Sequence, residues 1–228
     1  LTGAILLGAR KGKFDSKGNV NVMPGQSIPM ATLGVWILWL GWFGFNGASQ
    51  LALGSYADAN AVATIFANTT MAAAGGIIAP MVLSRLVEGK TNISATLNGA
   101  IAGLVSITAE PLTPSIGQAI IIGGIGGILC MYGMKLLDKL KIDDVVGAIP
   151  AHLFAGIWGT LIVPATNSGA NFSAQLIGVL AVNIFVFIVA YIVFSAIKAT
   201  IGLRLSKEGE TKGTDVTETG VIAYAIRD

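Results

Sequence analysis

The residue with the most chemistry to offer is the only histidine in the chain, His152. It lies in the middle of the apolar, glycine-rich run Val145–Val163, and two carboxylates, Asp143 and Asp144, stand just before that run. A neutral imidazole donates one hydrogen bond and accepts another, so it can pass on a proton or hold a small polar molecule. An ionisable side chain inside a membrane span indicates a functional site. A core histidine satisfied by one buried hydrogen bond is the structural alternative.

A second group of candidate residues lies in and after a dense aromatic stretch. Trp42 and Phe45 carry the aromatic series into the middle of an apolar run, which is consistent with an aromatic-lined cavity, although helix packing explains part of the series. Asn46 and Ser49 follow, and Thr108 ends another apolar run. Each polar residue alone is typical of a helix–helix hydrogen bond, but together with the histidine they could line a polar path. The sequence contains no metal-ligand cluster and no nucleophile beside a base, so we expect neither an enzyme nor a cofactor.

The composition decides which kind of protein must position these side chains. Apolar residues make up 54% of the chain and charged residues 11%, whereas soluble domains carry about 25% charged residues. A surface with so little charge predicts a polytopic, all-α membrane protein. The formal net charge of +2 gives no reason to expect a nucleic-acid partner. The single cysteine, Cys130, excludes an internal disulfide.

Six apolar runs follow a short apolar stub at the start of the chain, and each run is expected to form a membrane-spanning helix. The stub, Leu1–Ala9, would rise only about 14 Å as a helix, about half of a bilayer core, so we interpret it as the end of a truncated first helix. The third and fifth runs are short for the roughly 20 residues that a span needs. The runs are Ile28–Gly54, Ala61–Leu86, Ile93–Ile107, Ile116–Leu137, Val145–Val163 and Phe172–Leu203.

The distribution of positive charge supports this count of spans. All 14 Lys and Arg residues fall on the side that holds the end of the stub and the C-terminal tail. The segments on the other side carry only Asp58 and Glu110 as charged residues. Because cytoplasmic loops are enriched in Lys and Arg, both the stub end and the tail are predicted to be cytoplasmic. We therefore expect a partial membrane domain over residues 1–203 and a cytoplasmic tail over residues 204–228.

Small residues spaced four apart predict where the helices pack closely, because they let two helix backbones approach. The glycine-rich segment 123–127 could also suggest a phosphate-binding loop, but no strand precedes it and no Lys-Ser/Thr pair follows it. A tightly packed bundle with a polar path favours a channel or a transporter. The predicted close-packing pairs are Gly99 with Gly103, Gly123 with Gly127, and Gly156 with Thr160.

Two long stretches extend this interpretation to a family. WLGWFGFNGASQLA (Trp39–Ala52) and DDVVGAIPAHLFAGIWGTLIVP (Asp143–Pro164) resemble the Amt/Mep ammonium transporters, relatives of the Rh proteins. NTTMAAAGG (Asn68–Gly76), NGAIAGLVSIT (Asn98–Thr108) and the tail Ile201–Tyr224 match in the family order, so the resemblance covers essentially the whole chain. It implies the eleven-span ammonium transporter fold. This chain resembles the end of the fifth span and the sixth to eleventh spans, with the C-terminus inside.

The resemblance also implies a role for individual residues. Phe45 falls at one of two stacked phenylalanines that gate the outer vestibule, and Ser49 falls at the hydroxyl that helps to bind ammonium outside that gate. His152 falls at the second of the twin histidines in the hydrophobic pore. Asp144 matches the acidic residue before that histidine, and Thr108 is placed among the pore-associated positions.

The function implied by the resemblance is transport of ammonium or ammonia across the plasma membrane by a multi-pass, membrane-lipid-embedded protein. Ammonium would be recruited and deprotonated at the outer aromatic and hydroxyl site, and ammonia would pass the histidine-lined pore. The family assembles as a homotrimer, and its tail can report to a PII signalling protein. An ammonium sensor joined to a signalling module is the alternative. The residues of this chain that match the pattern of the family's tail are Gly202, Arg204, Gly213, Asp215, Gly220 and Tyr224.

Overall fold

The structure, a computed structural model, describes residues 1–25 and 27–223, so the tail residue Tyr224 lies outside the described residues. The described chain is helical, and its β-type pairing is an isolated antiparallel bridge between Phe14 and Val20. The all-α prediction is therefore confirmed. The contacts divide the described chain into two compact units.

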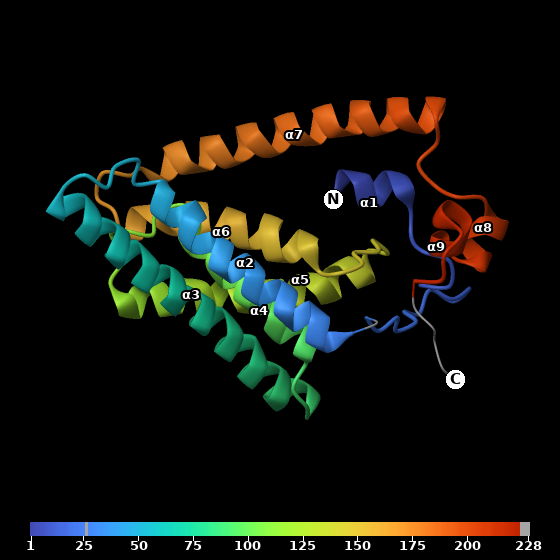
Figure 1. Cartoon of the computed structure of the whole chain (residues 1–228), viewed down its shortest axis with the longest axis horizontal. Helices are drawn as coiled ribbons and strands as arrows, with labels where there is room; N and C mark the ends of the chain where they lie inside the picture. Colours follow the sequence, from blue (N-terminus) through green and yellow to red (C-terminus); the bar gives the residue numbers. More distant parts are fainter. Residues whose placement is uncertain (26, 224–228) are drawn as a thin grey trace. The chain divides into compact units, whose positions relative to one another are not determined.

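The larger unit holds most of the predicted spans, and Figure 1 labels its helices and colours them in the order of the sequence. A π-helical turn, Pro150–Phe154, leads into its last complete helix, and a short 3-10 turn, Val163–Ala165, follows that helix. The helices of this unit are α2 (Ile28–Ala48), α3 (Tyr56–Glu88), α4 (Ile93–Thr108), α5 (Ile116–Lys139) and α6 (Ala155–Ile162), and α7 (Phe172–Thr200) begins in it.

Six helical segments correspond to the six predicted apolar runs. Four of them, α2, α3, α5 and α7, are long and apolar enough to cross a membrane, whereas α4 and the segment Pro150–Ala165 are shorter. This is the division expected from the sequence. Three ends differ from the prediction by five residues or more: α2 stops at Ala48 rather than Gly54, α3 begins at Tyr56 rather than Ala61, and the fifth segment begins at Pro150 rather than Val145. The serine before α3 caps the helix with its side chain, which explains the early start.

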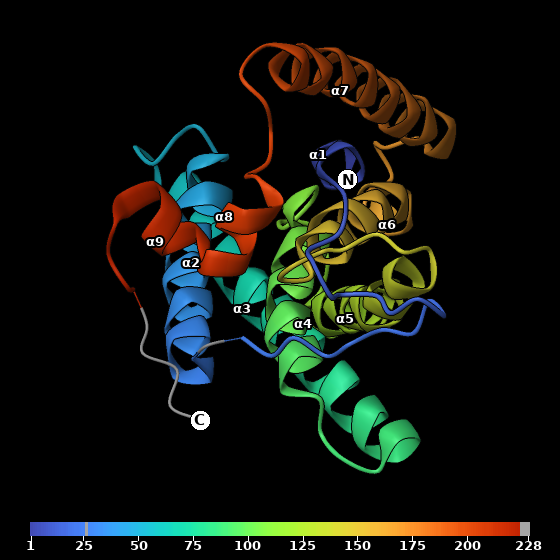
Figure 2. The ribbon, with the colours of Figure 1, turned by 90° about the vertical axis from the view of Figure 1, so that its right-hand side faces the viewer.

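The core of the larger unit is a bundle of α3, α4 and α5, which lie side by side in Figures 1 and 2. The backbones of these helices contact one another directly at glycine residues. A Cβ added to Gly76 would overlap the carbonyl oxygen of Gly99, and one added to Gly103 or Gly123 would overlap that of Ala72. The predicted close approaches at the pairs in α4 and α5 are therefore confirmed.

The predicted close approach at Gly156 in α6 is wrong, and the close approach lies three residues further along the helix. A Cβ on Gly156 would make only ordinary contact with Val105, at 3.6 Å from its Cγ1. The glycine that touches backbone is Gly159, where a Cβ would overlap Ser106. The small face that α6 turns toward α4 therefore contains Gly159, and the spacing of small residues alone did not identify it.

The bundle core continues into the turn that carries the histidine. Cys130 of α5 and Leu104 of α4 are fully buried in one cluster with Ala151 and Ala155, which flank His152. Trp42 packs against the same cluster. The elements that hold the candidate residues are thus attached directly to the best-packed part of this unit.

The smaller unit comprises residues 1–22, 141–143 and the described residues from Asn183 onward. It includes α1 (Thr2–Leu7), α8 (Lys207–Lys212) and α9 (Thr214–Thr219). Arg10 donates to both carboxylate oxygens of Asp143, at 2.8 and 2.9 Å, and this contact holds the pKa of that carboxyl below its usual value. Arg204 pairs with Glu210 and also donates to the carbonyl oxygen of Ala9. The proposed domain boundary between residues 203 and 204 stays a prediction.

Candidate functional site

Asp144 holds the start of the segment that carries His152. Its Oδ1 accepts hydrogen bonds from the backbone N–H groups of Gly147 and Ala148, both at 3.1 Å, and its Oδ2 accepts one from Ile149 at 2.7 Å. A carboxylate at this position satisfies N–H groups that have no partner within the helix, and it is favoured by the helix dipole. The chain reaches this geometry because Gly147 has a left-handed backbone, with φ of 80°.

Asn98 completes the same turn from the neighbouring helix. Val146 lies before the helix, because the first helical hydrogen bond runs from the N–H group of Ala151 to the carbonyl oxygen of Gly147. The carbonyl oxygen of Val146 accepts a hydrogen bond from the side-chain Nδ2 of Asn98, at 2.9 Å. The amide lies so close that a Cβ on Gly147 would be 2.9 Å from it. Asn98 and Gly147 therefore pack together at the entrance of the histidine turn, where Pro150 has no N–H group that would need a partner.

His152 lies in the π-helical turn Pro150–Phe154 rather than in an ordinary α-helix. The N–H group of Ala155 donates to the carbonyl oxygen of Pro150, which is the long hydrogen bond of a π-helix. Single π-helical turns are frequent at functional sites because they re-aim one side chain. The neighbouring residue Ala151 is buried, whereas the His152 side chain is exposed in the isolated chain. The turn therefore presents the imidazole outward from a well-packed backbone.

Trp42 connects the residues that the sequence singled out on different helices. Its indole Nε1 donates to the Oγ1 of Thr108 at 2.7 Å. Its ring lies 6.4 Å from that of His152, centroid to centroid, with 21° between the planes. The ring of Phe45 meets it edge-on, at 5.9 Å and 63°. Both distances fall within the range of favourable aromatic pairs.

Ser49 is attached to this group through the backbone of α2. Its hydroxyl donates to the carbonyl oxygen of Phe45 at 2.9 Å, which uses its only donor. The oxygen lone pairs remain, and the side chain is exposed. Phe45 is also exposed, at 63%. This end of α2 therefore offers an aromatic face and a hydrogen-bond acceptor to a cation that carries N–H groups.

Asn46 turns away from the exposed end of α2 and into the bundle. It is 1% exposed, and its Nδ2 donates to the Oγ1 of Thr69 on α3 at 3.0 Å. Its Oδ1 is buried without a hydrogen-bond partner. Asn46 thus fastens α2 to α3 in the described chain, and its predicted place in the path stays a prediction.

The structure brings some of the predicted residues together and separates others. Phe45, Trp42, Thr108 and His152 form one linked group, and Ser49 joins it through the Phe45 carbonyl. Asp144 is occupied by backbone N–H groups. In the described part of the chain, no group of three or more His, Cys, Asp or Glu side chains could hold a metal ion. The linked group offers rings, a hydroxyl acceptor and an imidazole, which suit a small cation.

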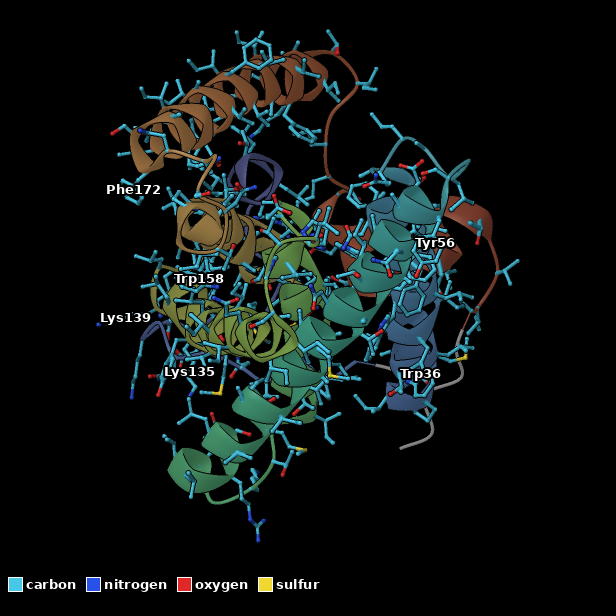
Figure 3. The ribbon with its side chains drawn as sticks, turned by 90° about the vertical axis from the view of Figure 1, so that its left-hand side faces the viewer. Trp36, Tyr56, Lys135, Lys139, Trp158 and Phe172 are labelled. Carbon is cyan, nitrogen blue, oxygen red and sulfur yellow. The ribbon has the colours of Figure 1, made fainter. Side chains whose placement is uncertain are left out.

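Two positioning residues were not assigned a site role from the sequence. Asn98 supports the histidine turn, and Trp158 of α6 donates its indole N–H to the carbonyl oxygen of Ile122 on α5, at 2.9 Å. Figure 3 shows Trp158 between these helices, on the opposite side of the unit from Trp36. No local pattern signals either contact, because each joins residues far apart in the chain.

Comparison with known proteins places this chain in a family. The model of the Ammonium Transporter Family matches residues 1–224. Ammonium transporter Amt2 of Archaeoglobus fulgidus is 37% identical, and the match covers 98% of this chain and 51% of that protein.

Solved structures agree with the sequence match. A chain described as Sensor Amt Protein is similar with a TM-score of 0.88 and 31% identity, over 96% of this chain and 56% of that one. The crystal structure of Mep2 from Candida albicans is similar with a TM-score of 0.80 and 26% identity, over 96% of this chain and 52% of that one. The chain spans about half the length of the relatives it matches. It is a multi-pass membrane protein, and it belongs to the ammonium transporter family.

Proposed function

We propose that the protein containing this chain carries ammonium or ammonia across the plasma membrane. The observation that carries the proposal is the ring group of Phe45, Trp42 and His152, in which Trp42 contacts both of the others. This group stands in a chain of the ammonium transporter family. The named functions of the relatives are transport of ammonium, which makes a transporter the preferred class over an enzyme.

The outer part of the proposed path binds the cation. Ammonium is similar to potassium in size, so charge alone cannot select it. The exposed face of Phe45 supplies cation–π attraction, worth about 0.5–2 kcal/mol. The free lone pairs of Ser49 accept a hydrogen bond from ammonium, which potassium cannot donate.

The inner part of the proposed path carries the neutral molecule. Taking an unpaired cation into an apolar passage is costly, so loss of a proton and passage of ammonia are favoured. The neutral imidazole of His152 can accept a hydrogen bond from ammonia and donate another, or take up the released proton. Asp144 contributes indirectly, because it holds the turn from which the imidazole projects.

The test is ammonium-dependent current in proteoliposomes that contain the full-length protein. His152→Ala and Phe45→Ala are each expected to abolish the current. Phe172→Ala is the matched control for the second variant, because Phe172 is also exposed, at 55%. Currents of full size in both site variants would overturn the proposed path. Ammonium binding without current in the unaltered protein would favour the sensor alternative.

We further propose the assembly and partners of this family for the full-length protein. It forms a homotrimer in the lipid bilayer, and its tail meets a PII signalling protein at the cytoplasmic face. The ordered contacts of Arg204 with Glu210 and Ala9 support a structured tail. Crosslinking of membranes tests the trimer, and a pull-down with purified PII protein tests the partner. A protein that crosslinks only as a monomer would contradict the first part.

A further inference from the structure

The hydroxyl of Thr108 makes two hydrogen bonds, one within α4 and one to α2. It donates to the carbonyl oxygen of Leu104 in its own helix at 2.7 Å, and it accepts from the indole N–H of Trp42 at 2.7 Å. Its one donor is therefore used, and one lone pair is occupied by the indole. This arrangement suits a residue that holds a neighbouring side chain better than one that binds a passing molecule.

The hydrogen bond from Trp42 to Thr108 also determines which part of the indole is left to contact other groups. An indole has a single N–H donor and no acceptor, and Thr108 takes that donor. The remaining surface of the indole consists of its ring faces and edges. His152 lies nearly parallel to the ring, and Phe45 meets it edge-on. Trp42 is thus an apolar wall shared by the two aromatic neighbours.

Thr108 belongs to a well-packed helix, α4, whereas Trp42 belongs to α2, which has few buried residues. Leu104, one turn before Thr108, is fully buried, and Gly103 lies against the backbone of α3. In α2, by contrast, Asn46 and Gly47 are the buried residues. A side chain on such a helix keeps one position only if a better-packed element holds it.

We propose that Thr108 is a positioning residue that fixes the Trp42 indole between Phe45 and His152 and thereby sets the size of cation or amine that passes. The inference rests on the proposed transport function and refines it, because it assigns selectivity to a residue that need not touch the substrate. When the anchor is removed, the indole can rotate about its side-chain torsions. The passage then discriminates less well between ammonium and its larger methylated analogue, methylammonium.

The first test compares transport of ammonium with transport of methylammonium by the full-length protein. Thr108→Val keeps the shape of the side chain and removes the hydroxyl. It is expected to lower the ammonium-to-methylammonium ratio by about fivefold, which corresponds to the loss of one hydrogen bond. Thr108→Ser restores the hydroxyl and is expected to restore the ratio. Thr64→Val is the matched control, because the Thr64 hydroxyl donates only to its own helix, at Asn60.

The second test observes the indole itself by fluorine NMR of protein labelled with fluorotryptophan. The Trp42 resonance is identified by its absence in Trp42→Phe. In Thr108→Val it is expected to shift and broaden, and in Thr108→Ser to keep its original position. Resonances of Trp158, whose N–H donates to Ile122, are expected to stay unchanged and report an intact fold.

A double-mutant cycle separates this inference from the proposed function. If Thr108 acts through Trp42, Thr108→Val changes the ratio much less in a Trp42→Phe background, which has no N–H group to hold. Additive effects would overturn the inference, as would an unchanged ratio and an unchanged Trp42 resonance in Thr108→Val. The proposed function would survive that outcome as long as His152→Ala still abolishes current. Should Thr108→Val fail to fold, Trp42→Phe alone provides the test, and an unchanged ratio there would equally overturn the inference.

Discussion

Glycines occur in both α4 and α2, but they meet different surroundings. Gly99 and Gly103 of α4 lie directly against the backbone of α3, where an added Cβ would overlap main-chain atoms. Gly34, Gly41 and Gly44 of α2 have nothing within 4 Å of the place where a Cβ would stand. Both helices are apolar and belong to the same unit. Hydrophobicity therefore does not distinguish the packed helix from the one that carries most of the site.

The difference lies in how each helix is held. The bundle of α3, α4 and α5 is held by close backbone approach, which tolerates no added atoms. The site end of α2 is held by side-chain hydrogen bonds, from Trp42 to Thr108 and from Asn46 to Thr69. We therefore expect changes in the bundle to act mainly on stability, and changes around α2 and the histidine turn to act mainly on function.

The largest expected effect is on the packed helix. Gly103→Ala places a Cβ on the carbonyl oxygen of Ala72, and because a backbone group cannot swing aside, we expect the free energy of unfolding to fall by about 3 kcal/mol. Gly41→Ala makes the same chemical change where space is open, and it should raise the free energy by up to about 1 kcal/mol through helix propensity. Thermal unfolding of the purified protein in detergent measures both. Equal effects of the two substitutions would contradict the claim that α4 is more closely packed than α2.

The next effect concerns the cap of the histidine turn. Asp144→Ala removes the acceptor for three backbone N–H groups and is expected to cost about 2 kcal/mol of stability. It should also reduce ammonium current, because the turn that aims His152 loses its fixed start. Asp144→Asn keeps an acceptor oxygen and should recover most of both quantities. A current that stays normal in Asp144→Ala would show that the turn holds its shape without the cap.

A smaller effect is expected where Asn98 donates a hydrogen bond to the chain just before the histidine turn. Asn98→Leu leaves the carbonyl oxygen of Val146 without its donor, at a cost of about 1 kcal/mol. Asn98→Asp keeps the size of the side chain but has no N–H donor at neutral pH, so it should be at least as costly. Unfolding temperatures of the two variants test this expectation. An unchanged unfolding temperature in Asn98→Asp would show that the amide donor does not stabilise the fold.

The smallest effect lies in the other unit, at Arg10 and Asp143. Because Arg10 lowers the pKa of Asp143 in the folded protein, the contact stabilises the fold fully above the unfolded Asp pKa of about 3.9. That contribution disappears as the pH falls below about 4 through the folded pKa. A modest drop in unfolding temperature is expected there, because Arg10 is partly exposed and the pair is screened. Asp143→Asn should lack this step, and an identical acid profile would contradict the assignment.

The helices were predictable because lipid imposes length and hydrophobicity on every span. The close approach at Gly99 and Gly103 was predictable because small residues four apart share one helix face. The position of Gly159 was not, because α6 follows a π-helical turn that shifts the register of the residues after it. A turn of that kind depends on tertiary contacts such as that between Asn98 and Val146, which no local pattern contains.

The candidate site shows the same limit. His152 and Phe45 could be selected from residue type and family resemblance. The bond between Trp42 and Thr108 joins residues far apart in the chain, so only the fold reveals it. Asp144 was expected before the histidine, but its use as a cap became visible only with the three N–H groups around its carboxylate.

The single cysteine of this chain has a practical consequence for labelling. Cys130 is fully buried in the cluster that joins α5 to the histidine turn, so a maleimide added to the folded protein cannot reach it. A cysteine introduced at an exposed position beside Ser49, such as Ala48→Cys, would then be the reactive thiol of this region. Its rate of modification with and without ammonium would report whether the outer end of α2 is occupied, with no need to alter the native thiol first.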